Sequence, residues 1–122
     1  MAIYKDLGFT YARNAGADLS GSLNLASHVD TDGDVVLAGA GEHVLGFITE
    51  AAVADKPATI QFAGIAKAIC GATVAAGARV ASDGAGKVVT ATTGDFEIGT
   101  ALEGGDAEEV IPVVMLPGRT HA

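Results

Sequence analysis

Three aspartates at alternate positions have the spacing with which a calcium-binding loop begins. They are Asp30, Asp32 and Asp34. Such a loop needs a glycine at its sixth position and a bidentate acid at its twelfth, where this sequence has Val35 and Gly41. The aspartates therefore indicate a solvated hairpin turn and no metal site.

A glycine-rich stretch around Lys87 resembles a phosphate-binding loop in outline only. Ala81 stands where the first glycine of that loop belongs, and Val88 stands where a metal-binding hydroxyl is required. The Asp-Gly pair at 83–84 instead predicts a tight hairpin. We expect Lys87 to be an exposed charge at the start of a strand.

The imidazole, thiol and carboxyl side chains do not converge on a catalytic arrangement. His28, His43 and His121 share no metal-ligand spacing. Cys70 follows an apolar segment, which favours a small core residue over a nucleophile. The acids are scattered through turns, and no pair is placed in a desolvated cleft. We therefore expect no catalytic residue, no metal and no cofactor, and we expect that the protein is not an enzyme.

Composition restricts the partners. The chain of 122 residues carries fifteen acids against seven bases, which gives a formal net charge of −8. This sign argues against nucleic acid, because binding to phosphates needs lysine and arginine. No apolar run reaches the length of a membrane span, and the N-terminus lacks the pattern of a signal peptide. We expect a soluble protein that is made in a cytoplasm and binds neither nucleic acid nor a membrane.

The elements that would position these residues occur twice in the chain, 53 residues apart and without a gap. Residues 35–50 align with residues 88–103, with identical residues at six of the sixteen positions. The register continues downstream, so we predict an internal pseudo-repeat of residues 35–62 and 88–115. A repeat made of strands and glycine turns describes a folded scaffold and contains no chemistry of its own.

Short extended segments alternate with turn signals from Leu23 to Leu116, as is typical of a small β-barrel or β-sandwich. We therefore predict a mainly β domain over residues 23–117 and a flexible tail over 118–122. A short helix is compatible with 51–55 or 72–78. Strands are expected near 23–29, 35–38, 44–49, 58–63, 65–69, 78–82, 87–91, 97–102 and 109–116.

Residues 1–22 show no sustained period of 2 or 3.6, and we interpret them as an extended N-terminal arm. Half of the aromatic residues lie here, at Tyr4, Phe9 and Tyr11. The aromatic side chains alone do not offset the entropy of ordering such an arm, so it needs a sheet edge to pair with. Two placements are open: on a partner's sheet, or around its own domain or a neighbouring subunit.

The last expected strand, Val110–Leu116, is apolar throughout, so both of its faces should be covered. Pro112 cannot donate to a ladder and suggests a position at a sheet edge or at the start of a strand. Two coverings are open, because either another subunit or a second sheet of the same chain can bury the outer face.

The order of these motifs resembles a known family. The segments are Asp83–Val89, Gly94–Glu103, Gly104–Glu109 and Val110–Leu116, preceded by Val44–Phe47 and Gly64–Ala68. Their glycine placement and hydrophobic pattern, over roughly residues 30–117, are similar to those of the small capsid decoration (cement) proteins of tailed bacteriophages and prophages.

This resemblance implies a β-rich virion protein, commonly a homotrimer, made in the host bacterial cytoplasm. It would sit on the outer capsid surface, where it bridges and stabilises subunits of the major capsid protein and has no active site. We assign capsid contacts to the arm, at Ile3, Tyr4, Phe9, Tyr11 and Arg13. We assign the oligomer interface to the last strand, at Val113, Met115 and Leu116.

Two other functions remain open at this point. A virion surface module for host or glycan binding would need exposed aromatic residues on the barrel loops, which here carry Gly, Ala and Asp. A small β-barrel oligomer unrelated to capsids is the other alternative.

Overall fold

The computed structural model describes residues 9–116 and 119–122, and these form ten strands. The mainly β fold predicted from the sequence is confirmed. The strands are β1 (Thr10–Asn14), β2 (Ala26–Val29), β3 (Val35–Leu37), β4 (Gly46–Glu50), β5 (Pro57–Gln61), β6 (Ile65–Ile69), β7 (Arg79–Ser82), β8 (Val88–Thr90), β9 (Gly99–Ala101) and β10 (Val110–Met115).

Neither of the two short helices considered above forms. Residues 51–55 and 72–78 lie in turns and irregular segments. Asp55 and Gly77 have φ values of 66° and 85°, which a right-handed helix does not contain. Among the residues the structure describes, no helix could cross a membrane.

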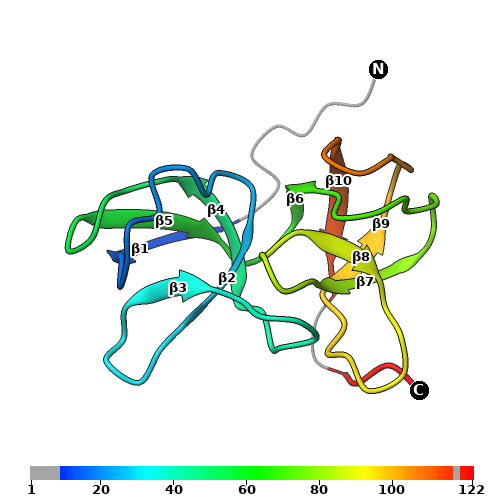
Figure 1. The fold of residues 1–122 in the computed structure, drawn as a ribbon, viewed down its shortest axis with the longest axis horizontal. Helices are drawn as coiled ribbons and strands as arrows, with labels where there is room; N and C mark the ends of the chain where they lie inside the picture. The colour runs from blue at the N-terminus through cyan, green and yellow to red at the C-terminus, as the bar shows by residue number, and fades with distance from the viewer. Residues whose placement is uncertain (1–8, 117–118) are drawn as a thin grey trace.

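The strands form two five-stranded antiparallel sheets that lie side by side (Figure 1). Their orders are β1-β5-β4-β2-β3 and β6-β10-β9-β7-β8. Each strand of the second sheet therefore has the same neighbours as the strand five numbers earlier in the first sheet. We call residues 9–62 repeat 1 and residues 64–116 repeat 2.

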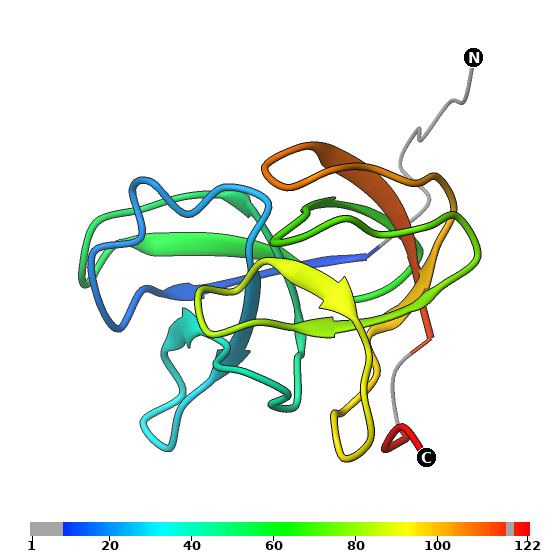
Figure 2. The ribbon, with the colours of Figure 1, turned by 45° about the vertical axis from the view of Figure 1, so that its right-hand side comes forward.

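Each sheet closes on itself through the residue that follows its first strand. Ala15 forms a parallel bridge with Val35, and Cys70 forms the same bridge with Val88. These contacts connect the two outer strands of each sheet, so each repeat is a small five-stranded barrel. Figure 2 shows the two barrels from a second direction.

The structural repeat is longer than the repeat visible in the sequence. Ala15 and Cys70 are equivalent at a spacing of 55 residues, whereas the strands from β2 and β7 onward are equivalent at a spacing of 53. Between its first and second strands, repeat 1 therefore has two more residues than repeat 2. This change in spacing hides the similarity of β1 and β6 from a gapless alignment.

The interior of each barrel is filled from equivalent positions. In repeat 1 the buried cluster consists of Ala15, Leu19, Val35, Ile48, Ala58 and Ile60. The equivalent residues in repeat 2 are Cys70, Val74, Val88, Ala101, Ile111 and Val113, which belong to a larger cluster. That larger cluster also contains residues of repeat 1, so it joins the two barrels.

The N-terminal segment, as far as it is described, belongs to repeat 1. All five residues of β1 pair with β5, from Thr10 opposite Gln61 to Asn14 opposite Pro57. Leu19 is only 2% exposed and lies in the barrel interior. Of the two placements left open by the sequence, this chain has the segment on its own sheet.

The C-terminal segment is also attached. Glu97 donates its N–H to the carbonyl of Arg119 at 2.9 Å, and His121 donates its N–H to the carbonyl of Asp95 at 2.7 Å. Figures 1 and 2 show the end of the chain beside the loop between β8 and β9. Residues 119–122, expected to form a flexible tail, are therefore held against repeat 2 by backbone hydrogen bonds.

Candidate functional site

The two barrels meet through different faces, which we name face A and face B. Face A of repeat 1 consists of Ala26, Ala38, Val44 and Phe47, and face B of repeat 2 contains Ala66, Ala68 and Met115. These seven residues belong to one buried cluster. Backbone hydrogen bonds cross the same junction, because Gly41 donates to Ser82 at 2.8 Å and accepts from Phe96 at 3.0 Å.

Face B of repeat 1 is not covered by any described part of the chain. At the positions of Ala66, Ala68 and Met115 it has Tyr11, Arg13 and Phe62. All five residues of β1 are exposed, whereas Ala66 and Ala68 of the equivalent strand β6 are buried. The same barrel face is thus an internal interface in one repeat and open in the other.

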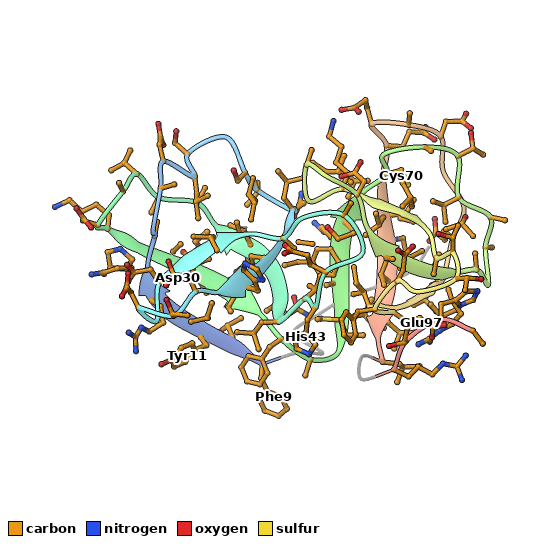
Figure 3. All side chains as sticks on the ribbon, turned by 60° about the horizontal axis from the view of Figure 1, so that its bottom comes forward. Phe9, Tyr11, Asp30, His43, Cys70 and Glu97 are labelled. Atoms are coloured by element: carbon orange, nitrogen blue, oxygen red, sulfur yellow. The ribbon has the colours of Figure 1, made fainter. Side chains whose placement is uncertain are left out.

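Aromatic side chains gather on this open face. Phe9 stacks on Phe62, with ring centroids 6.2 Å apart and an interplanar angle of 24°. Phe9 is 69%, Tyr11 48% and Phe62 39% exposed. Figure 3 shows Phe9 and Tyr11 projecting from the same side of the molecule. We call Phe9, Tyr11 and Phe62 the aromatic face.

Arg13 adds a positive charge beside the aromatic face. A hydrogen bond to Tyr11 and the charge of Asp34 raise the pKa of Arg13. Its guanidinium extends toward the tip of the hairpin between β2 and β3, since a Cβ placed on Gly33 would lie 2.7 Å from it. The sequence had grouped Phe9, Tyr11 and Arg13, and the structure places them together. Ile3 and Tyr4 lie outside the described residues.

The residues assigned to an oligomer interface are placed differently. Val113 is 0% and Met115 6% exposed, because both lie in the buried cluster of the chain itself. The strand that carries them pairs with β6 on one side and β9 on the other, so the position expected for Pro112, at a sheet edge or a strand start, is wrong. The middle of the apolar run is therefore covered from within the protomer, and of the three residues assigned to the interface only Leu116, 54% exposed, is accessible to another subunit.

Face A of repeat 2 carries an ion-pair network that the sequence reasoning missed. Glu97 has a fully buried side chain, and its carboxylate lies 2.7 Å from Arg79 Nε and 2.8 Å from Arg119 Nε. His121 Nδ1 lies 2.5 Å from the second carboxylate oxygen. Hydrogen bonds from Arg119, His121 and Arg79 lower the pKa of Glu97 to about 2. One feature of the sequence could have pointed to this network: the charged Glu97 aligns with the apolar Val44 in the repeat.

The aspartate turns are occupied by backbone groups. The carboxylate of Asp30 accepts the N–H groups of Asp32 and Asp34, both at 2.9 Å. Asp83, at the equivalent position, accepts from Ala85 at 2.8 Å and from Lys87 at 2.9 Å. These contacts match the hairpin turns predicted from the sequence. No group of three or more possible metal ligands occurs in the part of the chain that the structure describes.

The amine of Lys87 lies in an ion pair, and the thiol of Cys70 lies in the core. Lys87 Nζ forms an ion pair with Glu108, at 2.7 Å, on the surface. Cys70 is buried, and this burial, together with the charges of Glu109 and Asp106, raises the pKa of its thiol. A raised pKa reduces the thiolate that would react, so Cys70 is a core residue.

A cleft of about 290 Å³ opens near the start of β6. Its lining residues are Leu23, Asn24, Thr49, Gln61, Ile65 and Lys67. Because this lining contains no acid, imidazole or thiol, the cleft does not bring together an acid and a base.

Comparisons with known proteins point to phage heads. A family model described as "Phage cement protein" matches residues 16–116. Among solved structures, the fold is similar to that of the head fiber gp8.5 N base of bacteriophage phi29, with a TM-score of 0.71. The two sequences are 13% identical, and the alignment covers 93% of this chain and 98% of that chain. At this identity the likeness concerns the fold alone. No curated protein matches the chain.

Proposed function

The chain belongs to the phage cement protein family, and on this premise we propose that it binds the outer surface of the phage head and bridges neighbouring subunits of the major capsid protein. The observation that carries the proposal is the family match, which spans most of repeat 1 and all of repeat 2. The described surface agrees with a structural role, since exposed aromatic side chains gather on face B of repeat 1.

We assign the capsid contact to the aromatic face together with Arg13. Contiguous exposed apolar side chains are characteristic of protein interaction sites, and tyrosine and arginine are frequent among the residues that dominate binding energy. The equivalent surface of repeat 2, its face B, forms an interface within the chain, because it packs on face A of repeat 1. We assign Ile3 and Tyr4, which precede β1 in the sequence, to the same contact.

Bridging requires more than one contact for each assembled unit. We propose that several copies of the chain, a homotrimer by resemblance to the family, present several aromatic faces to the head at once. Each contact can then be weak, because tethering raises the effective concentration of the others. In this arrangement the acidic surface, with a net charge of −8 for each chain, faces the solvent.

The direct test is binding to expanded phage heads that lack this protein. We expect saturable binding at a fixed ratio to the major capsid protein and increased resistance of the heads to heat. Tyr11→Ala and Phe62→Ala should each weaken binding by about tenfold or more, the loss typical of truncating a central interface residue.

Leu102→Ala is the matched control, because Leu102 is an exposed apolar residue, 45% accessible, in the loop that follows β9 of repeat 2. It should bind like the unaltered chain. Failure of the unaltered chain to bind would refute the head-binding proposal. Normal binding by both aromatic-face variants would refute only the assignment of the surface.

A further inference from the structure

The junction between the barrels is heterologous, because face A of one repeat binds face B of the other. Contacts of this kind can continue head to tail, since each added unit presents the face that the next one needs. The described chain has one such face at each end. Repeat 1 exposes its face B, which is the aromatic face with Arg13, and repeat 2 has a face A that no third repeat covers.

The C-terminal segment occupies this second face. At the junction, the N–H of Gly41 donates to the carbonyl of Ser82 in repeat 2, at 2.8 Å. At the equivalent position 53 residues later, the N–H of Gly94 donates to the carbonyl of His121, at 3.0 Å. The C-terminal segment thus supplies to repeat 2 the hydrogen bond that repeat 2 supplies to repeat 1.

Side chains of the segment reinforce this placement. Arg119 and His121 both pair with Glu97, which belongs to face A of repeat 2. Figure 3 shows Glu97 in repeat 2, at the opposite end of the molecule from Asp30. Polar terminal caps are the usual way in which repeat proteins stop the addition of further units.

The two free faces carry charged side chains where the junction has apolar ones. At the junction, Val44 of face A and Ala68 of face B lie in one apolar cluster. The residues at the equivalent positions are Glu97 and Arg13, a negative and a positive side chain. On an uncapped face A, Glu97 keeps its ion pair with Arg79 and loses those with Arg119 and His121. Arg13 of a second chain would then supply a guanidinium in place of that of Arg119.

We propose that residues 119–122 are a cap that prevents copies of this chain from associating head to tail, and that the surface the cap excludes is the aromatic face of a second copy. The cap also leaves the aromatic face free for another partner. The inference goes beyond the proposed attachment to phage heads and does not depend on it, because its test contains no capsid.

The test is the mass in solution of a chain that ends at residue 118. Sedimentation velocity over a range of concentrations should show association that the full chain lacks at the same concentrations, with the mean mass about doubled at the upper end. Adding Tyr11→Asp to the truncated chain should restore the mass of the full chain. A peptide of residues 117–122 in excess should also dissociate the assembled truncated chain.

A chain that lacks only Ala122 is the matched control and should behave as the full chain does. If truncation to residue 118 prevents folding, His121→Pro removes the N–H that donates to Asp95 and loosens the cap with no residue lost. A folded truncated or His121→Pro chain with the mass of the full chain at every concentration would overturn the proposal. So would association that persists after Tyr11→Asp.

Discussion

Gly46 and Gly99, 53 residues apart, each lie against a backbone carbonyl oxygen of the neighbouring strand, at equivalent positions of the two repeats. A Cβ built on Gly46 would overlap the carbonyl oxygen of Gln61, and one built on Gly99 would overlap the carbonyl oxygen of Val114. Gln61 and Val114 are themselves 53 residues apart. The repeated glycines are therefore fixed by close approach of backbone in each barrel.

Replacing either glycine by alanine should destabilise the protein. Gly46→Ala and Gly99→Ala place a methyl group against a rigid carbonyl, so each should lower the free energy of unfolding by about 1–3 kcal/mol. Denaturant unfolding followed by circular dichroism measures this change. Gly84→Ala is the control, because no atom lies within 4 Å of a Cβ there, and it should change stability by less than about 0.5 kcal/mol. Equal effects at Gly84 and Gly46 would contradict the steric explanation.

The Glu97 network predicts a loss of stability in acid. The pKa of Glu97 is lowered from 4.5 to about 2 in the folded chain. A carboxyl group with a depressed pKa contributes stability that is complete above its unfolded value and is lost as the pH falls through its folded value. The contribution should therefore decline between about pH 4.5 and pH 2.

Glu97→Gln isolates this contribution. The variant should be less stable than the unaltered chain at pH 7, and the difference should shrink as the pH approaches 2. Thermal unfolding at a series of pH values measures it. Asp32→Asn, which removes one acidic charge from an exposed turn, is the control. A difference at Glu97 that stays constant down to pH 2 would contradict the predicted role of the ion pairs.

The effect of N-terminal truncation on stability should depend on whether β1 is removed. Deleting residues 1–8 keeps every contact described for repeat 1. Deleting residues 1–14 removes β1 from the edge of β5, at a cost on the order of 1 kcal/mol for each ladder hydrogen bond. Denaturant midpoints compare the two. The assignment of β1 to the sheet is wrong if the shorter chain is as stable as the longer one.

Cys70 should be unreactive in the folded protein. Its thiol is buried in the cluster that joins the barrels, and its pKa is raised, so little thiolate is present near neutral pH. A colourimetric thiol reagent should therefore react slowly in buffer and completely in denaturant. Rapid reaction of the folded chain would show that this part of repeat 2 opens readily.

Most strands were predictable because their residues alternate between barrel interior and solvent. In β5, Ala58 and Ile60 are buried, and the residues between and beside them are more exposed. The segment β1 lacks this signal, because all five of its residues are exposed. A strand held by backbone pairing alone leaves no hydrophobic period in the sequence, so it could not be told from an extended arm.

The candidate surfaces were predictable in part. Phe9 and Tyr11 stood out as aromatic residues outside any periodic segment, whereas Phe62 was interpreted as the end of a regular strand. The apolar run around Val113 gave the correct expectation that both faces are covered. Its covering by the same chain depends on the packing of the two barrels, which no local pattern encodes. The contacts of Glu97 with Arg119 and His121 depend on the same kind of tertiary information.

The two buried clusters differ in which parts of the chain they require. The interior of repeat 1 is built entirely from residues between Ala15 and Ile60, whereas the cluster of repeat 2 also includes Ala26 and Phe47. Chains emerge from the ribosome with the N-terminal residues first. Repeat 1 can therefore close its core while the rest is still being made, and it then offers a finished surface on which repeat 2 folds. The order of the cores along the chain matches the order of synthesis.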